Sequence, residues 1–136
     1  MPDGFRYARQ VQFAETDMAG IVHFSWMFRY MEEAEHALWR AAGMHIAHVG
    51  EETGWPRLSA TFEFKSPLYF EDEFEVLVRI DGVSRRTIRY ACTIRRGDTI
   101  IGSGTMITAL VLKGPPLQAI EIPSETIKRL QEAAEK

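Results

Sequence analysis

Residues 13–34 read FAETDMAGIVHFSWMFRYMEEA, and a change of hydrophobic period inside this stretch decides the fold. Over residues 5–13, which lead into it, apolar and polar side chains alternate, and this alternation predicts a half-buried strand. The side chains expected on the buried side are Phe5, Tyr7, Val11 and Phe13, and those expected on the opposite side are Arg6, Gln10 and Gln12.

A long helix is predicted to follow, because apolar residues recur at spacings of three and four. Its apolar stripe consists of Met27, Tyr30, Met31, Ala34, Ala37, Leu38, Ala41 and Ala42. Ser25 is the expected N-cap and Gly43 the expected C-terminal stop. Trp26, Phe28 and Trp39 widen the stripe, so we expect the helix to be buried on more than one side.

The remainder of the chain predicts four more strands and a short helix. The strands are expected at residues 59–66, 74–82, 88–94 and 100–112, after an irregular excursion over residues 44–58. A tight turn at residues 96–99 joins the last two strands into a hairpin, and an amphipathic helix follows Pro123.

These elements predict one α+β domain over residues 1–136. In it, an antiparallel five-stranded curved sheet wraps around one long central helix, and a short C-terminal helix follows. One helix cannot cover both faces of such a sheet. The uncovered face and the free strand edges therefore predict a homodimer or homotetramer.

Composition restricts the classes of function. The chain has 136 residues, of which 46% are hydrophobic and 26% charged, and its formal net charge is −3, so we expect a globular domain that does not bind nucleic acid. We see no apolar run long enough to span a membrane and no apolar signal core near the N-terminus, which predicts a cytoplasmic protein. Cys92, the only cysteine, stands in an apolar run and is typical of a buried small hydrophobe. No metal site is expected, because the sequence places no carboxylate or cysteine at a recognisable metal-ligand spacing from His36, His45 or His48.

A loop that carries a carboxylate leads directly into the predicted helix. The loop contains Asp17 and Gly20, and the helix N-terminus behind it presents unpaired N–H groups and a partial positive charge. Such a terminus can stabilise an oxyanion, and a neighbouring carboxylate can attack a carbonyl or activate water.

Structural roles also fit these residues. The spacing alone is equally consistent with Asp17 as a turn cap, and it favours His23 as an ordinary loop histidine. Glu32, Glu33 and Glu35 are more typical of a solvated helix face than of a general base.

The stretch FAETDMAGIVHFSWMFRYMEEA resembles the signature of the 4-hydroxybenzoyl-CoA thioesterase family within the hotdog superfamily. The resemblance continues through SATFEFKSPLYFEDEFEV at residues 59–76, VSRRTIRY at 83–90 and LQAIEIPSETI at 117–127, and so covers nearly the whole chain. It implies the hotdog fold and hydrolysis of an acyl-CoA thioester to a free acid and CoA. No metal and no other cofactor is implied.

By position, the resemblance implies that Asp17 is the catalytic carboxylate, that Gly20 is the turn glycine, and that the backbone N–H of Phe24 binds the thioester carbonyl. Arg85 and Arg86 fall where related enzymes place basic residues against the phosphates of CoA. The alternative for these two arginines is that they are solvated hairpin charges.

The acyl group is expected to bind around the start of the helix. The predicted substrate-binding residues are Val22, His23, Trp26, Met27 and Met31. Many bacterial relatives carry a histidine at the position of Phe24, whereas here the histidine is one place earlier, at His23. An aromatic acyl group and a short or medium aliphatic chain both suit this set.

Two other functions fit the same fold. A non-catalytic protein that binds acyl-CoA needs no carboxylate beside a thioester, so the presence of Asp17 favours the enzyme. A hydratase of this fold carries an Asp-x-x-Pro-x-His pattern, which we do not find in this sequence.

Overall fold

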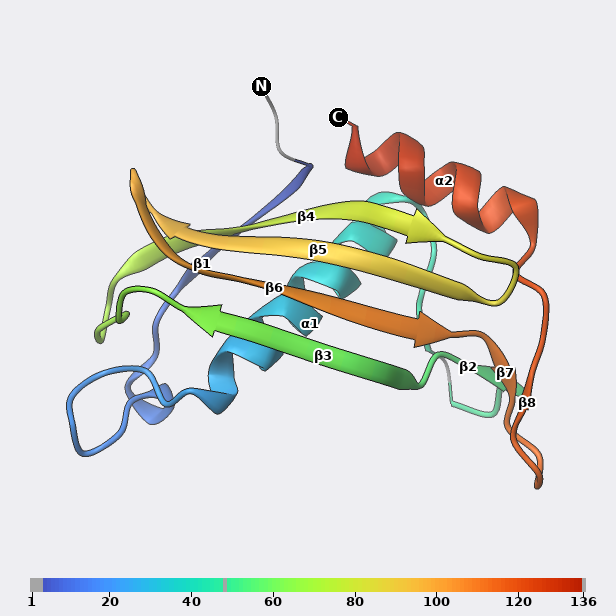
Figure 1. The fold of residues 1–136 in the computed structure, drawn as a ribbon, viewed down its shortest axis with the longest axis horizontal. Helices are drawn as coiled ribbons and strands as arrows, with labels where there is room; N and C mark the ends of the chain where they lie inside the picture. Colours follow the sequence, from blue (N-terminus) through green and yellow to red (C-terminus); the bar gives the residue numbers. More distant parts are fainter. Residues whose placement is uncertain (1–3, 48, 136) are drawn as a thin grey trace.

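The computed structural model describes residues 4–47 and 49–135, so His48 lies outside the described residues. The described chain forms an antiparallel sheet, a small second sheet and two helices (Figure 1). The elements are β1 (Phe5–Gln10), the 3-10 helix η1 (Phe13–Glu15), α1 (Ser25–Ala41), β2 (Thr53–Gly54), β3 (Arg57–Phe64), β4 (Glu73–Val83), β5 (Thr87–Arg96), β6 (Thr99–Ala109), β7 (Val111–Leu112), β8 (Gln118–Ala119) and α2 (Ser124–Ala134).

The main sheet has five strands in the order β1-β4-β5-β6-β3, and every neighbouring pair is antiparallel. This confirms the five-stranded antiparallel sheet predicted from the sequence. The predicted hairpin between β5 and β6 is also confirmed, because Arg96 pairs with Thr99 across the turn. Gly97 adopts a φ of 59° in that turn, which is the left-handed conformation that glycine adopts most easily.

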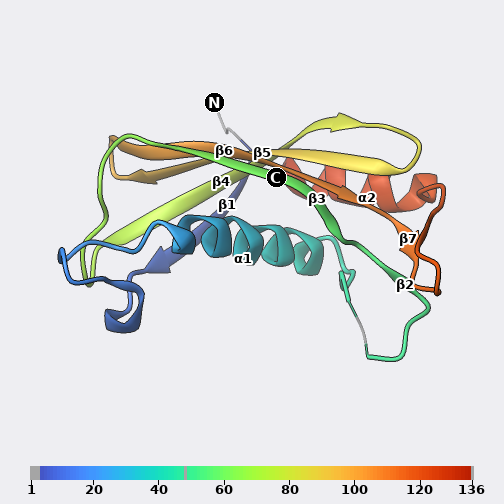
Figure 2. The same cartoon turned by 60° about the horizontal axis from the view of Figure 1, so that its bottom comes forward.

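Helix α1 packs against one face of the main sheet and runs along it (Figure 2). Most of its stripe forms the core together with the inward positions of the strands, whereas Ala41 at the end of the helix is exposed, contrary to the prediction. The largest fully buried side chains include Tyr30, Met31, Leu38, Ile88, Tyr90, Ile94 and Met106. Helix α2 packs against β4 and α1. No helix in the described part of the chain is long and apolar enough to cross a membrane.

Within the described residues, no helix covers the opposite face of the main sheet (Figure 1). Its outward side chains pair with one another across the strands: Glu75 forms ion pairs with Arg6 and Arg95, and the hydroxyls of Thr61 and Thr105 lie 2.7 Å apart. These pairs make at least the part of the face around Glu75, Thr61 and Thr105 polar. The oligomeric state itself stays a prediction.

The first strand is shorter than predicted. β1 ends at Gln10, and Phe13 lies in η1 with 74% of its surface exposed, so the predicted burial of Phe13 is wrong. The chain turns because the Glu15 carboxylate accepts a hydrogen bond from the Gln12 N–H at 2.9 Å, and the Glu15 N–H donates to the Gln12 carbonyl at 3.0 Å.

The ends of α1 are close to the predicted ones. The N-cap is Phe24 and not Ser25, since the Ser25 hydroxyl lies 2.9 Å from the ring nitrogen Nδ1 of His23 and does not cap the helix. Gly43 has a φ of 78° directly after the C-cap, as expected of a C-terminal stop.

The prediction that Glu35 lies on a solvated helix face is wrong. Its side chain is 0% exposed, and its two oxygens each accept a hydrogen bond of 3.0 Å from Arg57 on β3. Burial alone would lower the pKa of Arg57. The paired Glu35 carboxylate nevertheless raises this pKa above its ordinary value. A buried charge is tolerated because it is paired in this bidentate way.

The segment predicted as one strand over residues 100–112 is divided. β6 ends at Ala109, and β7 leaves the main sheet to pair with β2 and β8 in a small second sheet. Residues 53–54 of the predicted excursion therefore contribute a short strand.

Candidate active site

A tight loop connects η1 to α1. The Asp17 N–H donates to the Ile21 carbonyl at 2.8 Å, the Gly20 N–H donates to the Asp17 carbonyl at 3.0 Å, and Thr16 bridges to Val22. Gly20 has a φ of 84°, a conformation that residues with a Cβ rarely adopt. The role of Gly20 as a turn glycine therefore has a clear conformational basis.

Half-buried Asp17 presents its carboxylate beside this turn. Its oxygen Oδ1 accepts the Ala19 N–H at 2.8 Å, which is the local contact typical of an Asx turn. The other oxygen, Oδ2, accepts no hydrogen bond from any residue that the structure describes. One carboxylate oxygen orients the side chain, and the second is available to a ligand.

The start of α1 presents a free donor. Phe24 already has helical backbone angles, with φ −55° and ψ −32°, and its N–H donates to no acceptor within residues 4–47 and 49–135. The first turn of α1 contains no acidic residue, so nothing in it offsets the partial positive charge of the helix terminus. This end of the helix can therefore bind an oxygen that carries negative charge.

Asp17 and Phe24 line the same open cavity of about 500 Å³. Its other lining residues are Ile21, Val22, Met27, Phe64, Lys65, Ser66 and Pro67. Four predicted site residues therefore meet in one place: Asp17, Val22, Phe24 and Met27. The far wall, residues 64–67, was not predicted to be part of the site.

Nothing local in the sequence identifies that far wall. It joins the site through long-range backbone contacts: the Val22 N–H donates to the Leu68 carbonyl at 2.9 Å, and Ile21 bridges to Tyr69. These contacts depend on the path that the segment after β3 takes beside the Asp17 loop. The hydrophobic periodicity of the sequence does not predict this path.

Three predicted substrate-binding residues do not line this cavity. His23 is exposed and its ring lies against that of Phe24, with the ring centroids 4.5 Å apart. Trp26 is half-buried and packs on Tyr30, and Met31 is fully buried in the core.

The structure does not bring Arg85 and Arg86 to Asp17. These arginines precede β5, at the end of the sheet where the Leu110 N–H donates to the Arg86 carbonyl and the Ile122 N–H to the Arg85 carbonyl. The Asp17 loop lies at the opposite end of α1 (Figure 1), and a helix of 17 residues is about 25 Å long.

A hollow larger than the Asp17 cavity lies elsewhere in the described chain. It measures about 840 Å³ and is bounded by β4 and the C-terminal half of α2, with Arg79, Lys128 and Glu132 in its lining. It contains no carboxylate beside a free helix N-terminus, so we assign the chemistry to the smaller cavity.

Cys92 is buried, as predicted, and burial raises the pKa of its thiol to about 12. A thiol of this kind stays protonated near neutral pH and is a poor nucleophile.

Comparison with known proteins identifies the family. The family model of the thioesterase-like superfamily matches residues 11–130. A 1,4-dihydroxy-2-naphthoyl-CoA hydrolase from Thermosynechococcus vestitus is 31% identical, over 95% of this chain and 90% of the relative.

Solved structures agree with this match. A hypothetical protein from Aquifex aeolicus has a TM-score of 0.86 at 33% identity, with 93% of this chain and 98% of that chain covered. A gentisyl-coenzyme A thioesterase has a TM-score of 0.83 at 25% identity, with 92% of this chain and 98% of that chain covered. The chain therefore belongs to the thioesterase-like superfamily, shares its hotdog fold, and is a thioester hydrolase.

Proposed function

We propose that this protein is an acyl-CoA thioesterase in which Asp17 is the catalytic carboxylate and the Phe24 N–H is the oxyanion donor. The observation that carries the proposal is that Asp17 and Phe24 line one cavity, each with a free hydrogen-bonding group. Gly20 supports the site because its left-handed backbone lets the loop return toward the helix.

The reaction needs only the thioester and water, without a cofactor. In one route, an Asp17 oxygen bonds to the carbonyl carbon, the C–S bond breaks, CoA leaves as a thiolate, and water then hydrolyses the mixed anhydride. In the other route, Asp17 accepts a proton from water as the water oxygen attacks, and the proton passes to the departing thiolate. In both routes negative charge develops on the carbonyl oxygen, where the Phe24 N–H and the terminus of α1 stabilise it.

An aromatic acyl group is the substrate class that we favour. The cavity has Phe24, Met27 and Phe64 in its lining, and these side chains suit a flat apolar ring. Two of the proteins named above, the 1,4-dihydroxy-2-naphthoyl-CoA hydrolase and the gentisyl-coenzyme A thioesterase, act on thioesters that carry aromatic acyl groups. Roles for His23, Trp26 and Met31 in acyl binding stay predictions.

The separation of Arg85 and Arg86 from Asp17 supports a site shared between chains. If these arginines bind the CoA phosphates, a neighbouring chain has to supply them to the Asp17 cavity. β3 is an edge strand with a partner on one side only in the described chain, and such an edge can pair with another copy. We therefore propose a homodimer or homotetramer.

A panel of thioesters tests the proposed function. Aromatic and aliphatic acyl-CoAs are incubated with the protein, and release of free thiol is followed with time. We expect turnover, with kcat/KM highest for aromatic acyl groups. Saturable binding of acyl-CoA without thiol release would instead identify a non-catalytic binding protein, and hydration of an enoyl-CoA would identify a hydratase.

A further inference from the structure

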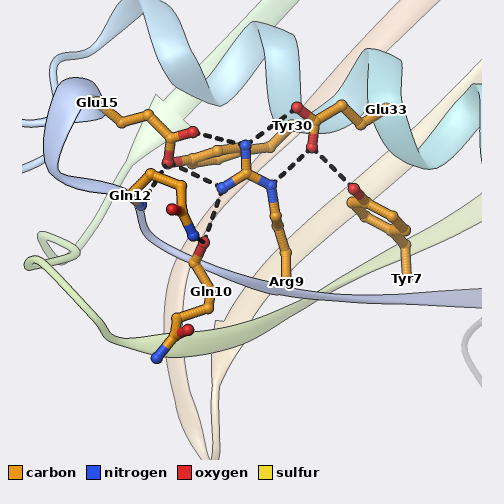
Figure 3. Close-up of polar contacts among 7 residues, drawn as sticks. All are labelled: Tyr7, Arg9, Gln10, Gln12, Glu15, Tyr30 and Glu33. Atoms are coloured by element: carbon orange, nitrogen blue, oxygen red, sulfur yellow. Dashed lines mark hydrogen bonds and ion pairs between the residues drawn. The ribbon is translucent and has the colours of Figure 1, made fainter.

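A partly buried ionic cluster lies at the base of the Asp17 loop (Figure 3). Arg9 on β1 reaches between Glu15 at the end of η1 and Glu33 on α1. The two terminal nitrogens of Arg9 donate to the two oxygens of Glu15 at 2.9 and 2.6 Å, and Arg9 Nε donates to Glu33 at 2.9 Å. The guanidinium carbon of Arg9 also lies 5.0 Å from the ring centre of Tyr30.

Glu15 is the more buried of the two carboxylates in this cluster. It is 3% exposed, and its oxygen Oε1 also accepts the Tyr30 hydroxyl at 2.7 Å and the Gln12 N–H at 2.9 Å. Burial alone would raise the pKa of Glu15, but the hydrogen bonds from Arg9, Gln12 and Tyr30 lower it below its ordinary value. Glu15 is therefore a buried, charged carboxylate whose orientation is fixed by three elements of the fold.

The backbone of the same residue connects this cluster to the proposed active site. The Glu15 carbonyl accepts the His23 N–H at 2.9 Å, and His23 directly precedes Phe24. On the other side, Glu15 lies two residues before Asp17. Glu15 thus stands at the neck of the loop, where the chain segments that lead to the carboxylate and to the oxyanion donor meet.

Charge-assisted hydrogen bonds have a directional requirement that apolar packing lacks. An apolar side chain at this position would fill the space but would not fix the rotation of the loop about β1. Catalysis depends steeply on the separation of reacting groups, and a misplacement of about 1 Å can cost about 10²-fold in rate.

We propose that Glu15, fixed by Arg9 and Tyr30, is a positioning residue that sets the Asp17 carboxylate against the Phe24 N–H. This inference rests on the proposed function of Asp17 and adds to it a role that lies outside the cavity. Glu15 itself does not line the cavity and takes no part in bond making or breaking.

The test compares two buried carboxylates that are paired in the same way. Glu15→Gln removes the charge at the neck of the loop. Glu35→Gln is the matched control, because Glu35 is also buried and held by a bidentate arginine, Arg57, but forms no hydrogen bond or ion pair with the loop within the described residues. Both variants are assayed on an aromatic acyl-CoA well below their melting temperatures, and the rates are corrected for the folded fraction.

We expect Glu15→Gln to lower kcat about 10- to 100-fold and to leave KM nearly unchanged. Glu35→Gln should lower the melting temperature and leave both constants near the wild-type values. Amide hydrogen exchange gives a second readout: in Glu15→Gln the amides of Val22 and His23 should exchange faster, while the core amides of β5 keep their protection.

Tyr30→Phe is the milder variant if Glu15→Gln does not fold, because it removes one hydrogen bond from Glu15 and keeps the ring. It should lower kcat less, in the same direction. Equal losses of kcat in Glu15→Gln and Glu35→Gln, or a loss confined to KM, would overturn the positioning role. The proposed function would fail separately, through an Asp17→Asn enzyme that keeps its activity.

Discussion

The Asp17 N–H donates a hydrogen bond of 2.8 Å to the Ile21 carbonyl, and this contact closes the loop that brings Asp17 to the N-terminus of α1. The loop is therefore a defined turn, with a left-handed residue at its tip and a partly buried ionic cluster at its base. Each of these features leads to a measurement.

Gly20→Ala should impair catalysis as well as stability. A left-handed backbone costs a residue with a Cβ about 1–2 kcal/mol, and no atom lies within 4 Å of a Cβ added at Gly20, so strain and not steric contact decides the outcome. Gly50→Ala is the control, because Gly50 has a φ of 87° and equally open surroundings but lies away from the site. Thermal melting should show similar losses in both variants, and only Gly20→Ala should lower kcat. If both variants kept the wild-type kcat, the loop conformation would not matter to the reaction.

Arg85→Ala and Arg86→Ala should raise KM for full-length acyl-CoA more than they lower kcat. Contacts with phosphates far from the thioester contribute to ground-state and transition-state binding alike. The comparison substrate is an acyl-pantetheine thioester, which carries no nucleotide phosphates and should be unaffected. Equal damage with both substrates would assign the arginines a structural role.

Acid should remove the stabilisation that Glu15 provides. Its pKa is lowered in the folded state, so the contribution is complete above the unfolded pKa of about 4.3 and is lost as the pH falls through the folded pKa. Melting temperatures of wild type and Glu15→Gln, measured from about pH 6 to about pH 3, should therefore converge as the pH falls. A difference that stayed constant over this range would contradict the charged state of Glu15.

Sequence periodicity anticipated the elements well, because strands and helix each carry a local pattern. The inward positions of β4 and β5, and the stripe of α1, follow directly from the spacing of their apolar residues. The loop from Asp17 to Phe24 was also predicted, since a carboxylate, a glycine and a helix start are all visible in the sequence.

The features that could not be predicted from the sequence depend on contacts between residues that lie far apart in the chain. The sequence pattern predicts Glu35 to be a surface residue. In the structure it is buried, because it forms an ion pair with Arg57 on β3. Phe13 continues the alternation of β1, but the chain turns there because Glu15 bonds to Arg9 and Gln12. The far wall of the cavity likewise depends on the backbone contact between Val22 and Leu68.

Mixed assemblies should show whether the site is shared between chains. An Asp17→Asn chain co-refolded with an Arg85→Ala/Arg86→Ala chain should give some assemblies with one intact site. The reason is that the loop before α1 and the connection between β4 and β5, which carries the arginines, lie at opposite ends of one subunit (Figure 1). Activity at limiting substrate should exceed the sum of the two parents. Strictly additive activity in verified mixed dimers would place the complete site in one chain, and an active monomer by light scattering would remove the premise.

The most direct measurement is the turnover of Asp17→Asn on an aromatic acyl-CoA. Asparagine is nearly isosteric with aspartate but can neither attack the thioester nor accept a proton, so we expect kcat to fall at least ~10²-fold. The melting temperature and the affinity for a non-hydrolysable acyl-CoA thioether should stay close to the wild-type values. An Asp17→Asn enzyme that folds, binds the thioether and turns over with a kcat near that of wild type would contradict the assignment of Asp17 as the catalytic carboxylate.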